Sequence, residues 1–138
     1  MGDSGGSRMQ IGQVAALTEL SIRTVRHYDD VGLVAPSARS AGGFRLYTED
    51  DVNRLLVIRR MKPLGFSLAE MRDLLEAIDI LDDDKASANA RKSAVRCLRD
   101  YREKTQDSAD RLRQQLAYAD ELAGLLAERA GARTTTHR

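Results

Sequence analysis

The feature that most limits the fold is a long segment, from about Ala86 to Ala123, that contains neither glycine nor proline. A helix of about forty residues at a rise of about 1.5 Å per residue would be about 60 Å long, too long to pack wholly on a small head domain. The charged content of 31% exceeds the average of roughly one quarter, which is typical of long solvated helices. We therefore expect a long helix that needs a partner.

A heptad repeat within this segment indicates what that partner is. Its a positions are Val95, Arg102, Ala109, Leu116 and Ala123, and its d positions are Leu98, Thr105, Leu112, Ala119 and Leu126. Arg102 and Thr105 make the middle of the seam polar, and the alanines bury little area. Such a seam should depend on extra contacts from the head, or on an antiparallel partner that places Arg102 beside an acid such as Asp107 or Asp110. We predict a homodimer whose helices form an antiparallel coiled coil.

Two short helical patterns lie near the N-terminus. Apolar residues recur from Ile11 to Leu20, and Ser21 is a good N-cap for a second stretch that ends near Gly32. Gly32 supplies the expected left-handed C-cap. Two short helices separated by a tight break at residues 18–21 predict a helix-turn-helix.

The next segment, residues 34–47, has a different pattern. Pro36 excludes a helix, and Gly42 and Gly43 can supply the positive φ of a hairpin turn or bulge. Apolar and polar residues alternate from Phe44 to Tyr47, as in a strand. We predict a two-stranded wing.

Two further helices follow the wing. Thr48 is the expected N-cap of the first, whose acidic first turn is favourable at the positive end of the helix dipole. Ser67 and Glu70 form a capping box that begins the second, an amphipathic helix reaching about Ile78. Together these patterns predict a mainly α protein with a head domain over 9–80, an acidic linker over 81–86 and a dimerisation helix over 87–128. The Gly/Ser-rich residues 1–8 and the tail 129–138 are expected to be disordered.

Composition excludes several function classes. The single cysteine, Cys97, permits neither an intrachain disulfide nor a multi-cysteine metal site within one chain, and favours a reducing compartment. Aromatic residues make up 4% of the chain, so a large aromatic-lined pocket is not expected. Neither of the two histidines lies in a catalytic motif. We expect a cytoplasmic protein that is not an enzyme, with no cofactor, no metal and no membrane segment.

The order of these elements, with the segments IGQVAALTELSIRTVRHYDDVGLVAP, GGFRLYTEDDVNRL and LGFSLAEMRDLL, resembles the MerR family of bacterial transcription regulators. The resemblance covers about residues 10–80 by motif, and the long helix by position. It implies a winged helix-turn-helix head whose second helix enters the major groove while the wing contacts the DNA backbone. This chain would be a short form, without a separate C-terminal ligand domain.

The resemblance also implies DNA contacts at particular positions. These are Arg23, Thr24, Arg26, His27 and Tyr28 on the second helix, and Arg39, Gly43, Arg45 and Tyr47 on the wing. The chemistry is sensible, because arginine binds phosphates and guanine edges, and glycine lets backbone amides approach the sugar–phosphate chain. The formal net charge is only +1, but positions 23–62 hold eight Lys/Arg against five acids, so the basic excess is local.

The implied mechanism is that of a dimer that binds a pseudo-palindromic promoter operator and distorts it, so that RNA polymerase can use the same promoter. The deformation costs on the order of 1–6 kcal/mol, offset by the contacts it permits. Alternatives are a simple repressor without a small-molecule effector, or a coiled-coil interaction protein. An effector could be a small molecule, a protein partner or absent.

Several positions keep two interpretations. Glu19 stands where the family usually has glycine, which leaves a different turn geometry open, and His27 stands where tyrosine is common. Tyr47 can contact DNA or pack the wing on the head. Arg54, Arg59 and Arg60 can be phosphate contacts or surface charges. Cys97 is more readily structural than a sensor, and the acidic run at 82–84 is more readily a solvated linker than a cation site.

Overall fold

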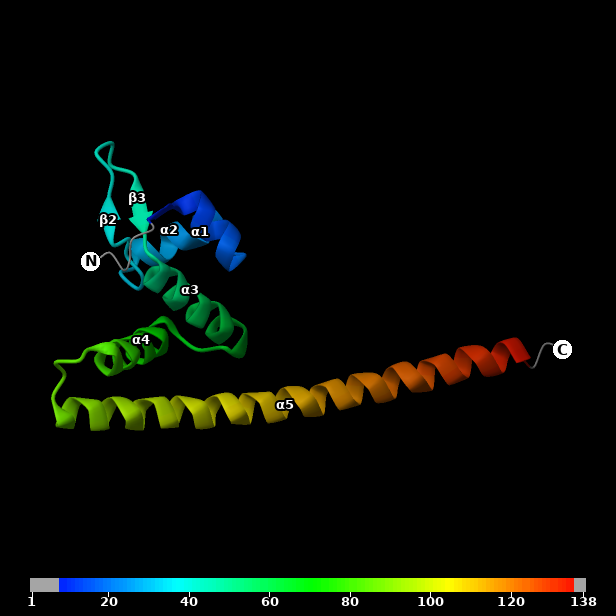
Figure 1. Cartoon of the computed structure of the whole chain (residues 1–138). Helices are drawn as coiled ribbons and strands as arrows, with labels where there is room; N and C mark the ends of the chain where they lie inside the picture. Colours follow the sequence, from blue (N-terminus) through cyan, green and yellow to red (C-terminus); the bar gives the residue numbers. More distant parts are fainter. Residues whose placement is uncertain (1–7, 136–138) are drawn as a thin grey trace. The chain divides into compact units, whose positions relative to one another are not determined.

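The computed structural model describes residues 8–135, with side chains through residue 132. The chain divides into two compact units, residues 1–98 and residues 99–138. Helix α5, which spans Ala88–Thr135, begins in the first unit and forms the described part of the second (Figure 1). Within the described residues, no helix is both long enough and apolar enough to cross a membrane.

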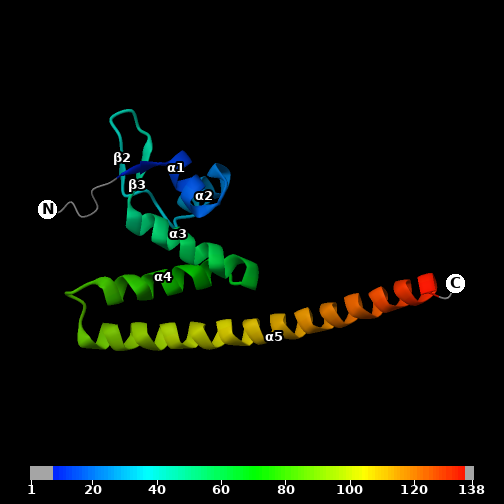
Figure 2. The same ribbon diagram turned by 45° about the vertical axis from the view of Figure 1, so that its right-hand side comes forward.

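The first unit is mainly helical with a small sheet, which confirms the predicted winged helix-turn-helix head. Helix α1 lies against both α2 and α3, and the hairpin extends away from them (Figure 2). In chain order the elements are β1 (Met9–Gln10), α1 (Ile11–Thr18), α2 (Ile22–Asp30), β2 (Ala38–Arg39), β3 (Arg45–Tyr47), α3 (Glu49–Met61), the 3-10 helix η2 (Lys62–Leu64) and α4 (Leu68–Asp82).

The sheet has three antiparallel strands in the order β1-β3-β2, so the prediction of two strands was incomplete. Met9 pairs with Tyr47, and Ala38 pairs with Leu46 on the other side of β3. Strand β1 has only two residues, too few to show the alternation by which a strand is recognised in a sequence. Its pairing with β3 attaches Met9 and Gln10 to the wing.

Side-chain caps begin the helices where the sequence predicted. Ser21 Oγ accepts a hydrogen bond of 3.0 Å from the Thr24 amide at the start of α2. Thr48 and Ser67 each form a complete capping box, with Asp51 and Glu70 respectively. These caps satisfy amide groups that the first turn of a helix leaves unpaired. The backbone therefore turns into α2, α3 and α4 at defined residues.

The core of the first unit lies between α1, α2, α3 and α4. Val14, Val25, Leu55 and Ile58 are fully buried, and Met71 of α4 is 1% exposed. Burying a side chain of this size contributes about 1.5–3 kcal/mol. The core fixes the orientation of α2, and with it the direction in which the exposed face of α2 points.

Glu19 ends α1 in the left-handed conformation, with φ 58° and ψ 30°. The turn thus keeps the geometry for which glycine is favoured, and the different geometry left open by the sequence is not adopted. Arg59 of α3 holds this turn, because its Nη1 donates 2.8 Å to the Thr18 carbonyl and lies 3.4 Å from Glu19 Oε1. These contacts offset part of the conformational cost of a non-glycine residue.

The connection between α4 and α5 is shorter than predicted. Helix α4 extends to Asp82 and α5 begins at Ala88, so the segment expected to be a linker from residue 81 starts inside α4. Arg91 Nη2 donates 2.8 Å to the Asp83 carbonyl, and Ser87 Oγ accepts 3.1 Å from the Ala90 amide. The turn is therefore held by hydrogen bonds at both of its ends.

Helix α5 also runs further than predicted. Residues 129–135 are helical, so the prediction that disorder begins at 129 was wrong for these residues. Gly131 costs a helix only about 1 kcal/mol, and the alanines on either side of it are good helix formers. The disorder predicted for residues 1–7 and 136–138 falls outside the residues that the structure describes.

Candidate nucleic-acid interface

Helix α2 presents its basic side chains on one face. Arg23, Arg26 and His27 are exposed, whereas Val25 and Tyr28 are buried in the core. Residues three and four apart lie on the same side of a helix, so the three exposed side chains form one surface. This surface has the charge and hydrogen-bond donors needed for phosphates and base edges.

Tyr28 anchors α2 rather than extending its exposed face. Its side chain is 4% exposed, and burial raises the pKa of its hydroxyl. Its carbonyl accepts hydrogen bonds from the amides of Leu33 and Val34, at 2.9 and 3.2 Å, where Gly32 adopts the predicted positive φ of 74°. Tyr28 therefore positions the end of α2, which is a structural role at a residue predicted to contact DNA.

The wing tip is a tight hairpin between β2 and β3. Gly43 has φ 84°, a conformation that favours glycine, as the sequence predicted for this pair of glycines. Arg39 Nη1 donates 3.3 Å to the Gly43 carbonyl, and the Ser40 amide donates 2.9 Å to the Phe44 carbonyl. Phe44 itself is 64% exposed. The tip therefore exposes backbone groups, the Arg39 guanidinium and the Phe44 ring to solvent.

A carboxylate of α2 holds the two wing arginines. Asp29 Oδ2 accepts 2.7 Å from Arg45 Nε and lies 3.6 Å from Arg39 Nη2. The hydrogen bond to Asp29 raises the pKa of Arg45, so its guanidinium is charged at every relevant pH. Asp29 joins the wing to the helix that carries Arg23 and Arg26. It was counted in the sequence only as an acid that lowers the local charge.

Tyr47, also predicted to contact DNA, lies in the core. Its side chain is fully buried, and its hydroxyl has no hydrogen-bond partner among the described residues. Burial is the main cause that raises the pKa of this hydroxyl. A direct phosphate contact would require the side chain to leave its site. The structure therefore favours the other interpretation of Tyr47, in which it packs the wing on the head.

A pocket of about 540 Å³ lies beside the exposed face of α2. Arg59 of α3 and Lys62 of η2 contribute to it, in addition to residues of the helix-turn-helix. Its lining residues are Leu20, Arg23, Thr24, His27, Tyr28, Arg59, Lys62 and Pro63. Sequence reasoning did not identify Lys62 as a site residue, although the local charge count included it. The pocket shows that the basic surface extends from α2 onto the end of α3.

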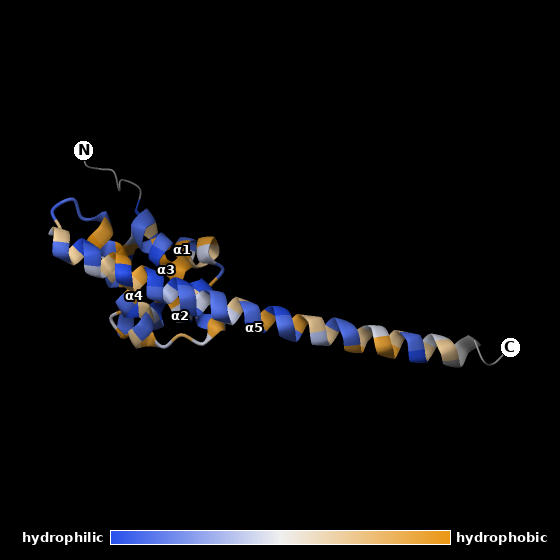
Figure 3. Ribbon diagram, turned by 90° about the horizontal axis from the view of Figure 1, so that it is seen from below, coloured by the Kyte–Doolittle hydropathy of each residue, from blue (hydrophilic) through white to orange (hydrophobic). Residues whose placement is uncertain are grey.

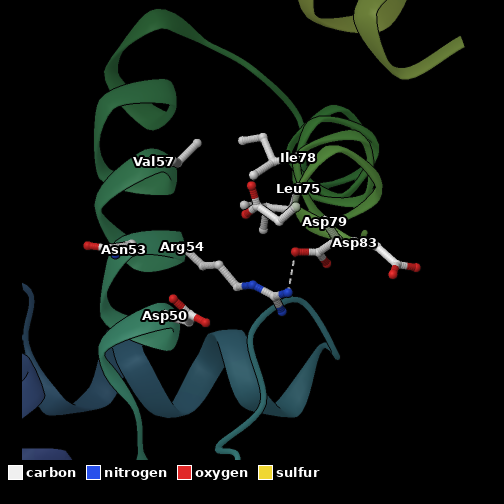
Figure 4. Close-up of a pocket in the computed structure, with 9 residues that line it drawn as sticks. Asp50, Asn53, Arg54, Val57, Leu75, Ile78, Asp79 and Asp83 are labelled. Carbon is white, nitrogen blue, oxygen red and sulfur yellow. Dashed lines mark hydrogen bonds and ion pairs between the residues drawn. The ribbon is translucent and has the colours of Figure 1, made fainter. Parts of the chain in front are cut away.

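A second pocket, of about 430 Å³, lies between α3 and α4 and has the opposite character (Figure 4). An ion pair between Arg54 and Asp79 crosses it, below Val57, Leu75 and Ile78 in this view. The remaining charged residues of its lining are the carboxylates Asp50, Asp82 and Asp83. This surface repels phosphate, so it does not belong to the nucleic-acid interface. Arg54 connects α3 with α4 instead of reaching toward DNA.

Cys97 lies against α4. Its Sγ is 3.6 Å from Asp73 Oδ2, and its side chain is partly buried. Among residues 8–135, no group of three His, Cys, Asp or Glu side chains is placed to hold a metal ion. The contact with Asp73 gives Cys97 a place in the packing of α5 on α4.

The part of α5 in the second unit leaves an apolar row exposed. Leu112, Leu116 and Leu126 are 49%, 61% and 56% exposed. Hydrophobic positions recur along this part of the helix in Figure 3. Of the predicted dimerisation residues in this unit, Thr105, Ala119 and Ala123 are also exposed and Ala109 is partly buried, while Val95 and Leu98 of the first unit are partly buried.

Two family descriptions match most of the chain. The MerR HTH family regulatory protein matches residues 9–78, and the MerR DNA-binding family matches residues 52–128. A HTH-type transcriptional regulator of Pseudomonas aeruginosa, itself uncharacterized, is 36% identical over 72% of this chain and 74% of its own length. The HTH-type transcriptional regulator CueR of Vibrio cholerae is 40% identical over 62% of this chain and 60% of its own length.

Other relatives are longer. The nodulation protein NolA of Bradyrhizobium elkanii is 42% identical over 55% of this chain, but the match spans only 35% of NolA. Among solved structures, a MerR-family regulator from Bacillus cereus is 30% identical, with a TM-score of 0.51 over 83% of this chain and 79% of that one. HiNmlR, described as a MerR-family regulator lacking the sensor domain and bound to promoter DNA, has a TM-score of 0.61 at 22% identity, covering 80% and 79% of the two chains.

Proposed function

The chain belongs to the MerR family of DNA-binding transcription regulators, and from that premise we propose that it acts as a dimer on a pseudo-palindromic promoter operator and distorts the DNA there. The observation that carries the proposal is the exposed basic face of α2 formed by Arg23, Arg26 and His27. The Pseudomonas and Vibrio relatives are named as transcription regulators, not as enzymes.

The head offers two regions that could contact one duplex, helix α2 and the wing. Helix α2 would enter the major groove with Arg23 and Arg26 at base edges or phosphates, while Arg39 and the Gly43 backbone contact the sugar–phosphate chain. Asp29 of α2 forms ion pairs with both Arg39 and Arg45 of the wing. Two DNA-contacting regions held in a fixed relative position can distort the duplex, because the DNA must deform to contact both at once. The free energy of the two sets of contacts offsets the deformation energy.

The basic pocket beside α2 fits a phosphate of the DNA backbone. Lys62 is exposed at its rim, and Arg23 and His27 contribute to the same lining. A phosphate there would receive donors from two elements, α2 and η2, which would fix the register of the head along the duplex. Its contribution would not depend on the base sequence.

The dimeric form rests on α5. The exposed leucines of its second half have the spacing of a coiled-coil seam, and a helix with such a row is stable in water when the row is covered. A two-fold dimer presents two heads to two half-sites, which is why the operator is expected to be pseudo-palindromic. RNA polymerase would then bind the same promoter as the regulator.

A band-shift titration on the DNA upstream of the gene tests the proposal. Specific retardation that weakens steeply with salt is expected, and Arg26→Ala should weaken it by about ten- to a hundredfold if Arg26 reads a base. Arg113→Ala is the matched control, since Arg113 is an exposed arginine of α5 paired with Asp110. Equal binding of operator and unrelated duplex at every salt concentration would contradict sequence-specific recognition.

Two alternatives give different results in the same assays. A simple repressor would bind the operator without changing its bend, which a circular-permutation band shift measures. A coiled-coil interaction protein would dimerise and bind no duplex. The basic face of α2 and the wing arginines favour the regulator, because an interaction protein has no use for them.

A further inference from the structure

The pocket between α3 and α4 has features of a small-molecule site that the proposed function does not use (Figure 4). Its volume of about 430 Å³ falls within the range of about 300–1,000 Å³ that is typical of ligand pockets. Both helices belong to the first unit of the chain, so a single head forms the pocket. Its mainly acidic lining separates it from the basic pocket beside α2.

Part of the lining is apolar. Val57 of α3 and Ile78 of α4 point toward each other between the two helices, with Leu75 beside Ile78 (Figure 4). Leu75 is buried, but Val57 and Ile78 are only partly buried, so some of their apolar surface remains in contact with water. An apolar group that covers this surface gains free energy in proportion to the area removed from water.

The rest of the lining is strongly acidic. Four aspartates and one arginine line the pocket, which leaves it a net charge of −3. The arginine, Arg54, is already paired with Asp79. Asp50 and Asp82 are exposed and form no ion pair with any residue that the structure describes. A positively charged ligand would therefore meet carboxylates whose charge is not yet compensated.

Two of these carboxylates lie at an unfavourable place on their helix. The C-terminal end of a helix carries a partial negative charge, so acids are destabilising there and cations are stabilising. Helix α4 nevertheless ends at Asp82 with Asp83 as its C-cap, and its last turn contains no basic residue. Arg91 of α5 donates to the backbone carbonyls of Leu81 and Asp83, which satisfies the backbone but not the two carboxylates. A bound cation would compensate them.

These features together favour an organic cation over a metal ion. Mg²⁺ and Ca²⁺ require several oxygen ligands around one point. Within the described part of the chain, the aspartates of this pocket do not form a group of three that could hold a metal ion. A hydrated metal ion would also gain nothing from the apolar part of the lining, whereas a cation that carries an apolar group contacts both parts.

The two helices of the pocket lead to different parts of the nucleic-acid interface. Helix α3 follows strand β3 of the wing directly, with Thr48 as its N-cap. Helix α4 contacts the end of α2, because Arg72 Nη2 donates 2.9 Å to the carbonyl of Val31, the C-cap of α2. Asp29, two residues earlier, pairs with the wing arginines. A ligand that favours one spacing of α3 and α4 would therefore change the position of α2 relative to the wing.

We propose that the pocket between α3 and α4 binds an organic cation that carries an apolar group, and that this binding changes the affinity of the head for DNA. The cation would lie beside Asp50 and Asp82, and the apolar group would cover Val57 and Ile78. The change in DNA affinity rests on the proposed function, whereas the binding itself does not. Coupling between two sites is reciprocal, so DNA must change the affinity for the cation by the same factor.

Calorimetric titration of the full chain without DNA tests the site. The probe is benzyltrimethylammonium, in which an aromatic ring is joined to a quaternary ammonium group. Tetramethylammonium, benzyl alcohol and Mg²⁺ are compared with it at equal ionic strength. The probe should bind about tenfold more tightly than each of the three, because it alone contacts both parts of the lining. No binding of the probe, or equal binding of tetramethylammonium, would overturn the proposal, and tighter binding of Mg²⁺ would show a metal site instead.

Three variants, each checked for folding by circular dichroism, locate the bound probe. Asp50→Asn and Asp82→Asn should each lower the affinity about three- to tenfold, because each removes a carboxylate beside the cation. Asp84→Asn is the matched control and should leave the affinity nearly unchanged, since Asp84 is an exposed acid of the adjoining turn that does not line the pocket. Equal losses in all three variants would contradict a site in this pocket. Dissociation of the Asp50 and Asp82 variants to monomers without probe would show that a second copy fills it, which also overturns the proposal.

Operator titrations with and without the probe test the effect on DNA binding. Saturating probe should change the dissociation constant about fivefold or more, relative to the same concentration of tetramethylammonium chloride. Arg72→Met should keep probe binding and lose most of this change, because the donor to Val31 is absent, whereas Arg72→Lys keeps one donor and should retain more of it. Probe binding that leaves operator affinity unchanged would contradict the coupling. Probe binding without any operator binding would contradict the proposed function instead, so the two failures are distinguishable.

Discussion

Asp29 Oδ2 accepts a hydrogen bond of 2.7 Å from Arg45 Nε, and this contact joins the end of α2 to strand β3. Asp29 is only 14% exposed, and Arg39 approaches the same oxygen at 3.6 Å. One carboxylate therefore sets the direction of two cations on the wing. The position of the wing relative to α2 depends on it.

Replacing Asp29 by alanine should lower DNA affinity by several-fold, although the change removes a negative charge. Charge alone predicts the opposite sign, since less repulsion from phosphate strengthens binding. The loss is expected because Arg39 and Arg45 are no longer held in position. The measurement is a binding titration on the operator at fixed salt. Asp30→Ala is the control: Asp30 is the exposed neighbour, and its removal should leave affinity unchanged or raise it slightly. A gain of affinity for both variants would show that only charge matters.

Tyr47→Phe should stabilise the head by about 1 kcal/mol. The Tyr47 hydroxyl is buried without a partner in the described residues, and leaving a polar group in this state costs about 1–3 kcal/mol. Phenylalanine keeps the ring that packs the wing. Urea unfolding measures the change. Tyr118→Phe is the control, because Tyr118 is 62% exposed and should give no change. If Tyr47→Phe were destabilising, the hydroxyl would have to make a hydrogen bond.

Stability should fall at alkaline pH, in part through Tyr47. Burial raises the pKa of Tyr47 above its ordinary value of about 10, so the unfolded chain releases this proton at a lower pH than the folded chain. The folded state thus binds more protons above about pH 10, and stability decreases as pH rises. Burial raises the pKa of Tyr28 as well, in the same direction. Tyr47→Phe should make the decline from pH 9 to 11 shallower, measured as thermal midpoints. An unchanged slope would contradict the assignment to Tyr47.

Local rules predicted most of the head, because α2, α3 and α4 each begin with a strong capping signal. The caps at Ser21, Thr48 and Ser67 are satisfied by side chains within three residues, so a sequence shows them directly. Strand β1 was missed because its only support is pairing with β3, far along the chain. The end of α5 was missed because Gly131 weakens a helix without ending it.

The candidate site was predictable where it depends on one helix face and less so where it depends on packing. Exposure of Arg23 and Arg26 follows from the helical period. The burial of Tyr47 does not, because it depends on which side of β3 the head covers. Likewise, Arg59 lies beside α1 through a contact between residues forty-one positions apart. No local sequence pattern predicts such a contact.

Glu19→Gly should raise the free energy of unfolding by about 0.5–1 kcal/mol. Glu19 has φ 58°, and a non-glycine residue pays on the order of 1 kcal/mol for the left-handed conformation. The lost contact of 3.4 Å with Arg59 involves a carboxylate that is 82% exposed, so it contributes little. Chemical denaturation measures the gain. Glu19→Ala is the control, since it removes the same carboxylate and keeps the strain. Equal effects of the two substitutions would show that the backbone conformation is not the cause.

Lys62→Ala should weaken binding to the operator and to unrelated duplexes by a similar factor. Lys62 lies at the rim of the basic pocket with Arg23 and His27, where a backbone phosphate would fit. Each lost phosphate contact reduces the magnitude of the negative slope of log K against log salt by about 0.9. A dimer loses two such contacts, so its slope should become shallower by nearly 2. Titrations at four salt concentrations, on both duplexes, measure the slope. Lys85→Ala is the control: Lys85 is an exposed lysine of the turn between α4 and α5, and its removal should leave the slope unchanged. A selective loss on the operator alone would instead mean that Lys62 contacts a base.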